Sequence, residues 1–144
     1  MYRERMETLK EWKVSKNRKP LIIRGARQVG KTWLMKEFGK LYYEKCAYIN
    51  FDNNSRMDIL FNEEFDLNRI IQGLKIESGI NIEPENTLII FDEIQETPNA
   101  LKALKYFYEN ANEYHIVAAG STHTVKFSPS TTERICVVAY CPAR

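Results

Sequence analysis

Apolar residues along the chain follow two spacings, one typical of strands and one typical of helices. Short apolar runs of the kind that form buried strands occupy residues 21–23, 46–51, 87–91 and 114–119. Apolar residues spaced three or four positions apart predict helices over residues 2–15, 32–43, 55–77 and 98–110. The third helical segment is expected to break near Asn62. Because strands alternate with helices, we expect an α/β fold with a parallel sheet covered by helices on both faces.

The helical spacing also predicts which side chains of three helices face the core. They are Met6, Leu9, Trp12 and Lys13, then Leu34, Met35, Phe38, Leu41 and Tyr42, and finally Leu101, Leu104, Phe107 and Tyr108. A further apolar run at Ile135–Tyr140 is a candidate fifth strand in a segment that is otherwise poorly specified.

Composition indicates one soluble globular domain, with 144 residues, 44% hydrophobic and 28% charged. A net charge of +2 is too small to indicate a nucleic-acid surface, and we interpret the basic residues at positions 13, 16, 18 and 19 as a solvated helix end and loop. The three cysteines have no metal-ligand spacing, which favours a reduced intracellular protein. No apolar run approaches the roughly 18 residues of a membrane span, and the charged start does not resemble a signal peptide. We therefore expect a cytoplasmic location.

The strongest motif reads G-A-R-Q-V-G-K-T and lies between a predicted strand and a predicted helix. This arrangement is typical of a phosphate loop, in which glycines let backbone amides approach phosphate oxygens and a helix N-terminus adds partial positive charge. Lys31 is placed to contact the β- and γ-phosphates, and the Thr32 hydroxyl to ligate Mg²⁺. The predicted ATP-binding residues are Gly25, Ala26, Arg27, Gln28, Val29, Gly30, Lys31 and Thr32.

Two carboxylates follow the clearest predicted strand, at Asp92 and Glu93. A buried parallel strand delivers such residues to the edge of the sheet where ligands bind. We expect Asp92 to hold Mg²⁺ and Glu93 to act as the base that orients or deprotonates an attacking water. A kinase of the phosphate-loop type needs no base here, because its nucleophile arrives on the substrate.

Polar residues end two other predicted strands. In ATPases with an extra strand between the phosphate-loop strand and the acidic strand, the position of Ser121 senses the γ-phosphate or positions water; a plain turn is the alternative. Asn50 and Asp52 are expected near the same edge, although a strand-terminal turn explains them equally well. We interpret His115 as a strand-start residue and His123 as a surface loop residue, because neither has an evident catalytic or metal partner.

With these elements placed, the chain resembles the AAA+-type ATPases of bacteria and archaea, in the family whose full-length members join an ATPase core to a C-terminal domain of poorly defined role. The resemblance rests on residues 21–32, 48–52, 90–95 and 119–121. It implies a three-layer phosphate-loop core with the extra strand of the AAA+ type. It also implies Lys31 and Thr32 as nucleotide ligands, Asp92 for Mg²⁺, Glu93 as catalytic base and Ser121 as sensor.

The sequence departs from that family after Ser121. Members usually continue with a strand, a candidate arginine finger, a helical lid and the C-terminal domain, whereas here Arg134 is at best a weak candidate finger. We therefore expect an ATP-binding core at residues 1–121, with helix 2–15 and phosphate loop 25–32, and an atypical truncated tail at residues 122–144. Either a truncated member or a reading frame altered near Ser121 explains the tail.

The leading hypothesis is Mg²⁺-dependent ATP hydrolysis coupled to conformational change on a protein or nucleic-acid partner, with no membrane. The alternative is an ATP-binding switch without efficient hydrolysis, favoured by the missing lid and arginine finger. Glu93 disfavours a phosphotransferase, and the lack of an Asn-Lys-x-Asp segment disfavours a GTPase. Oligomerisation is open to full-length relatives and is in doubt for this chain.

Overall fold

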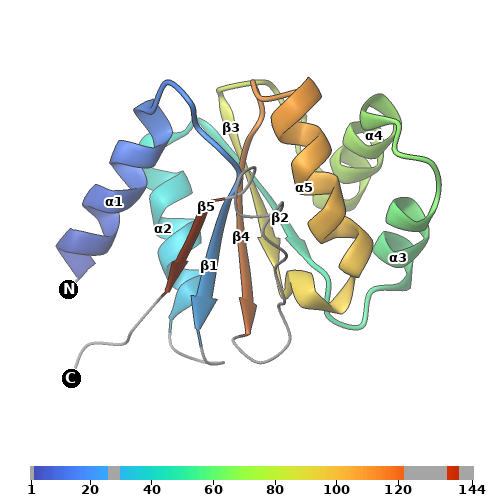
Figure 1. Cartoon of the computed structure of the whole chain (residues 1–144), viewed down its shortest axis with the longest axis horizontal. Helices are drawn as coiled ribbons and strands as arrows, with labels where there is room; N and C mark the ends of the chain where they lie inside the picture. The colour runs from blue at the N-terminus through green and yellow to red at the C-terminus, as the bar shows by residue number, and fades with distance from the viewer. Residues whose placement is uncertain (1, 26–29, 122–135, 140–144) are drawn as a thin grey trace.

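The computed structural model describes residues 2–25, 30–121 and 136–139, in which a central sheet lies between two layers of helices (Figure 1). The strands are β1 Leu21–Gly25, β2 Lys45–Asn50, β3 Thr87–Asp92, β4 His115–Ser121 and β5 Cys136–Ala139. The helices are α1 Tyr2–Val14, α2 Lys31–Tyr42, α3 Ser55–Asn62, α4 Leu67–Ser78 and α5 Pro98–Asn110, with a short 3-10 helix, η1, at Ile94–Glu96. The predicted alternation is confirmed, and α3 ends at Asn62, where the break was expected.

The sheet has the strand order β2-β3-β4-β1-β5, and every neighbouring pair is parallel. Strand β4 therefore lies between β1, which leads into the phosphate loop, and β3, which carries the acidic pair. This is the extra strand expected of the AAA+ type. The edge strand β5 corresponds to the candidate strand at Ile135–Tyr140 and pairs with β1. Because all strands run the same way, their carboxyl ends meet at one edge.

Two hydrophobic cores lie on opposite faces of the sheet, because successive side chains of a strand alternate between its faces. On β1, Leu21 and Ile23 pack with α1 and α2, whereas Ile22 packs in the other core. The α1 side chains that fill the first core are Met6, Leu9 and Trp12, as predicted.

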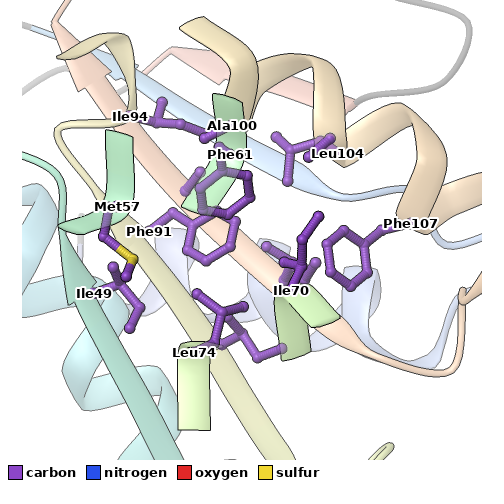
Figure 2. Close-up of a cluster of buried hydrophobic side chains, with 14 of the residues drawn as sticks. Ile49, Met57, Phe61, Ile70, Leu74, Phe91, Ile94, Ala100, Leu104 and Phe107 are labelled. Atoms are coloured by element: carbon purple, nitrogen blue, oxygen red, sulfur yellow. The ribbon is translucent and has the colours of Figure 1, made fainter. Parts of the chain in front are cut away.

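Helices α3, α4 and α5 cover the second face, where they bury a cluster rich in isoleucine and phenylalanine (Figure 2). Phe51, Phe61 and Phe91 form an aromatic group whose ring centroids are 5.1 to 6.0 Å apart. Phe91 lies one residue before Asp92, so this packing fixes the end of β3 at the edge of the sheet.

One residue of the predicted core faces is placed wrongly. Leu41 is 51% exposed, because the inward-facing stripe of α2 continues from Phe38 to the partly buried Tyr42. On α5, Leu104 and Phe107 are buried as predicted, Leu101 is partly buried against the same core, and Ala100 and Ala103 are buried as well. These small alanines let the helix lie close to the sheet.

Candidate functional site

A cavity of about 710 Å³ opens at the edge of the sheet where the strands end and α2 begins. Its lining combines the start of α2 with the ends of β2 and β3, and comprises Gly30, Lys31, Thr32, Trp33, Lys36, Tyr48, Asn50, Asp52, Asp92 and Glu93. The structure thus brings Lys31 and Thr32 together with Asp92 and Glu93, which follow about sixty residues later in the sequence.

Lys31 is the first residue of α2 and lines the cavity. Its side chain is buried, and its Nζ donates a hydrogen bond to the carbonyl oxygen of Gly25 at 2.6 Å. Gly30 precedes it with φ of 93°, a left-handed conformation that favours glycine. A buried ammonium is costly unless it has polar partners. The contact with the Gly25 carbonyl therefore gives the buried Lys31 ammonium a polar partner, and it links the two ends of the loop.

Asp92 accepts hydrogen bonds from three elements. The Thr32 hydroxyl donates to Oδ2 at 2.6 Å, and the Tyr48 hydroxyl donates to the same oxygen at 2.7 Å. The backbone N–H of Glu93 donates to Oδ1 at 3.0 Å. Asp92 is only 6% exposed. Its carboxylate is consequently fixed in orientation by α2, β2 and the chain that follows β3.

Glu93 has a backbone conformation that non-glycine residues rarely adopt, with φ of 55° and ψ of 46°. Such left-handed residues cluster at functional sites, where the surrounding structure maintains the strain. The Gln95 side chain donates a hydrogen bond from Nε2 to Oε1 of Glu93 at 3.1 Å. The left-handed turn and this contact place the second carboxylate on the cavity wall beside Asp92.

Tyr48 is a cavity residue to which sequence reasoning assigned no role. Burial, followed by its hydrogen bond to Asp92, raises the pKa of Tyr48, so the phenol remains a neutral donor. The Lys36 ammonium lies 4.1 Å from the centroid of its ring. Alternation along β2 places Tyr48 and Asn50 on one face, and this much the sequence could have indicated. The register, in which Asn50 pairs with Asp92, then places that face beside Asp92.

The other predicted residues are distributed as follows. Asn50 and Asp52 line the cavity, and the Asn50 side chain also accepts a hydrogen bond from the Asp52 N–H at 2.9 Å, as in a strand-terminal turn. Ser121 ends β4, in register with Gly25 of β1. The predicted contacts of residues 26–29, the candidate finger Arg134 and His123 lie outside the described residues.

The oxygen donors of the cavity suit a magnesium nucleotide. A hydroxyl and a carboxylate are hard ligands, and Mg²⁺ usually takes one or two protein ligands while retaining waters and phosphate oxygens. Across the described ranges, no cluster of three or more His, Cys, Asp or Glu side chains could hold a metal by itself. The pairing of Thr32 with Asp92 fits a metal that also has phosphate oxygens as ligands.

The fold and this cavity define a phosphate-loop core of the AAA+ ATPase type. The chain belongs to the AAA domain family, whose sequence profile matches residues 17–142. Among solved structures, C. elegans PCH-2 is similar with a TM-score of 0.52 and 15% identity; the match covers 99% of this chain and 40% of that chain. No curated protein matches the chain. In the part of the chain that the structure describes, no helix has the length and hydropathy to cross a membrane.

Proposed function

We propose that this protein binds ATP together with Mg²⁺ and hydrolyses it. The observation that carries the proposal is the meeting of Lys31 and Thr32, from the start of α2, with Asp92 and Glu93, from the end of β3, in one cavity. The cavity lies at the carboxyl edge of a parallel sheet, where open α/β folds bind their ligands.

The phosphate-binding side of the site uses charge and backbone amides. Lys31 would exchange its contact with the Gly25 carbonyl for the β- and γ-phosphate oxygens, whose charge it offsets. The N-terminus of α2 adds backbone N–H groups and the positive end of its dipole. Thr32 and Asp92 would hold Mg²⁺, which neutralises phosphate charge when it is bound.

The hydrolytic side of the site uses Glu93. Its carboxylate would accept a proton from a water molecule as the water oxygen attacks the γ-phosphorus, and the bond from that phosphorus to the ADP oxygen breaks. Gln95 restrains the Glu93 carboxylate through its hydrogen bond.

At the end of β4, Ser121 is proposed as the sensor because its register partner Gly25 begins the phosphate loop. Turnover would be coupled to a conformational change that acts on a protein or nucleic-acid partner.

Glu93→Gln tests this assignment. The substitution keeps the size and polarity of the side chain but removes the proton-accepting charge. ATP affinity measured by calorimetry should stay within about threefold, whereas phosphate release should fall roughly 10²- to 10⁴-fold. Glu96→Gln is the matched control, because Glu96 is exposed and does not line the cavity.

Lys31→Ala supplies the background for the same measurements. We expect it to lose ATP binding. Unchanged turnover in Glu93→Gln would reject Glu93 as the base, and wild-type turnover no faster than that of Lys31→Ala would favour an ATP-binding switch over an ATPase.

A further inference from the structure

The hydroxyl of Tyr48 reaches Asp92 from β2, which is an outermost strand of the described sheet. Tyr48 pairs with Ile90, two residues before Asp92. Two residues along a strand span roughly 6.6 Å, a distance that a tyrosine side chain can cover. The hydroxyl ends 2.7 Å from Oδ2 of Asp92, the oxygen that also accepts from Thr32. Two hydroxyl donors from different elements therefore converge on one carboxylate oxygen.

Packing holds the Tyr48 ring in place independently of that hydrogen bond. The ring lies against the core formed by α1, α2 and one face of the sheet. Its face is covered by the ammonium of Lys36, one helical turn beyond Thr32 on α2. A side chain fixed in this way presents its hydroxyl at a defined point, so little rotamer entropy remains to be lost when the site is occupied.

We propose that Tyr48 is a positioning residue for the Thr32–Asp92 pair, and that its hydroxyl sets how strongly ATP binding depends on Mg²⁺. This inference rests on the proposed function. With Oδ1 held by the Glu93 N–H and Oδ2 held by Tyr48, the carboxylate plane stays fixed, and the Thr32 hydroxyl keeps its direction toward the cavity.

The expected size of the effect follows from similar arrangements around other metals. Groups that orient a metal ligand without touching the metal typically change metal affinity 10- to 100-fold when they are removed. Here Asp92 retains two of its three hydrogen bonds, so the loss should lie at the low end of that range. The binding of ATP without metal depends on Lys31 and the loop, and it should not change.

Tyr48→Phe tests the inference, because phenylalanine keeps the ring and its packing and removes only the hydroxyl. Calorimetric titrations with ATP are made in excess Mg²⁺ and again in a chelator. We expect the affinity of Tyr48→Phe to fall about tenfold in Mg²⁺ and to stay within twofold of wild type in the chelator. Thermal melting of each protein confirms that it is folded.

Tyr43→Phe is the matched control. Tyr43 has a buried ring and, like Tyr48, a hydroxyl with a side-chain partner, here His115 at 2.6 Å, but it does not line the site cavity. Its removal should change melting without changing the ratio of the two affinities. The Tyr48 comparison thereby separates positioning from general destabilisation.

The outcomes distinguish this inference from the proposed function. If Mg²⁺ raises the ATP affinity of Tyr48→Phe by the same factor as that of wild type, the inference is overturned. The proposed ATP binding then stands. An equal loss of affinity with and without Mg²⁺ would likewise overturn it, because that pattern indicates a structural role. If wild type does not bind ATP at all, both fall.

Discussion

The carboxylate of Asp92 connects the residues that sequence reasoning identified with one that it did not. Lys31, Thr32 and Asp92 could be predicted because each belongs to a contiguous motif whose chemistry depends on local spacing. Tyr48 could not, because its contact with Asp92 depends on the register between β2 and β3 and on a side chain that spans two residues. Alternation along β2 places Tyr48 on the same face as Asn50, but the register between β2 and β3 leaves no periodic trace in the sequence.

Two substitutions at Thr32 isolate the role of its hydroxyl, because valine has nearly the size of threonine and serine keeps the hydroxyl. Thr32→Val removes the hydroxyl that donates to Asp92 at 2.6 Å, whereas Thr32→Ser retains it. We expect Mg²⁺-dependent ATP affinity to fall at least tenfold in the valine variant and to stay within about threefold in the serine variant. Calorimetry in Mg²⁺ measures both affinities, and equal affinities for the two variants would contradict a ligand role for the hydroxyl.

At the scale of elements, the chain's alternation predicted the helices and strands well because buried parallel strands and amphipathic helices have distinct apolar spacings. The exact helix faces were less predictable. They depend on how closely each helix approaches the sheet, which small residues decide. Gly39 of α2 is an example, because a Cβ added there would lie 1.9 Å from the sulfur of Cys46 on β2.

Gly39→Ala should therefore destabilise the fold even though alanine favours helices by about 1 kcal/mol over glycine. Overpacking of this kind typically costs about 1–3 kcal/mol. In a Cys46→Ala background the obstructing sulfur is absent, and the nearest remaining atom is Cδ2 at the end of the Leu88 side chain, at 3.2 Å. The cost should then become smaller. Urea unfolding of the four proteins in this cycle measures the coupling, and additive effects would contradict direct contact.

At the scale of the whole molecule, the edge of the sheet opposite the cavity contains a buried histidine. His115 begins β4, is 5% exposed, and contacts the Tyr43 hydroxyl. Burial, with smaller contributions from the charges of Arg18 and Lys13, lowers the pKa of His115 to about 4. Sequence reasoning placed this residue at a strand start but could not detect its partner, which is 72 residues away in sequence.

This histidine should make the fold sensitive to mild acid. Its pKa is lower in the folded protein than the ordinary 6.5, so the stabilisation is complete above pH 6.5 and decreases as the pH falls toward 4. Between pH 6.5 and 5 the free energy of unfolding should drop by roughly 2 kcal/mol. Denaturant unfolding across that interval measures it. His115→Gln should remove most of the slope, and an unchanged slope would assign it to other groups.

The position of β4 has a consequence for the distance between the strand that leads into the phosphate loop and the strand that ends at Asp92. Neighbouring strands are about 4.8 Å apart, so the strand inserted between β1 and β3 separates their axes by nearly 10 Å. Strand β4 is thus a spacer, and its width is set by backbone hydrogen bonds rather than by side chains. Side-chain substitutions along β4 should therefore leave the span between β1 and β3 unchanged.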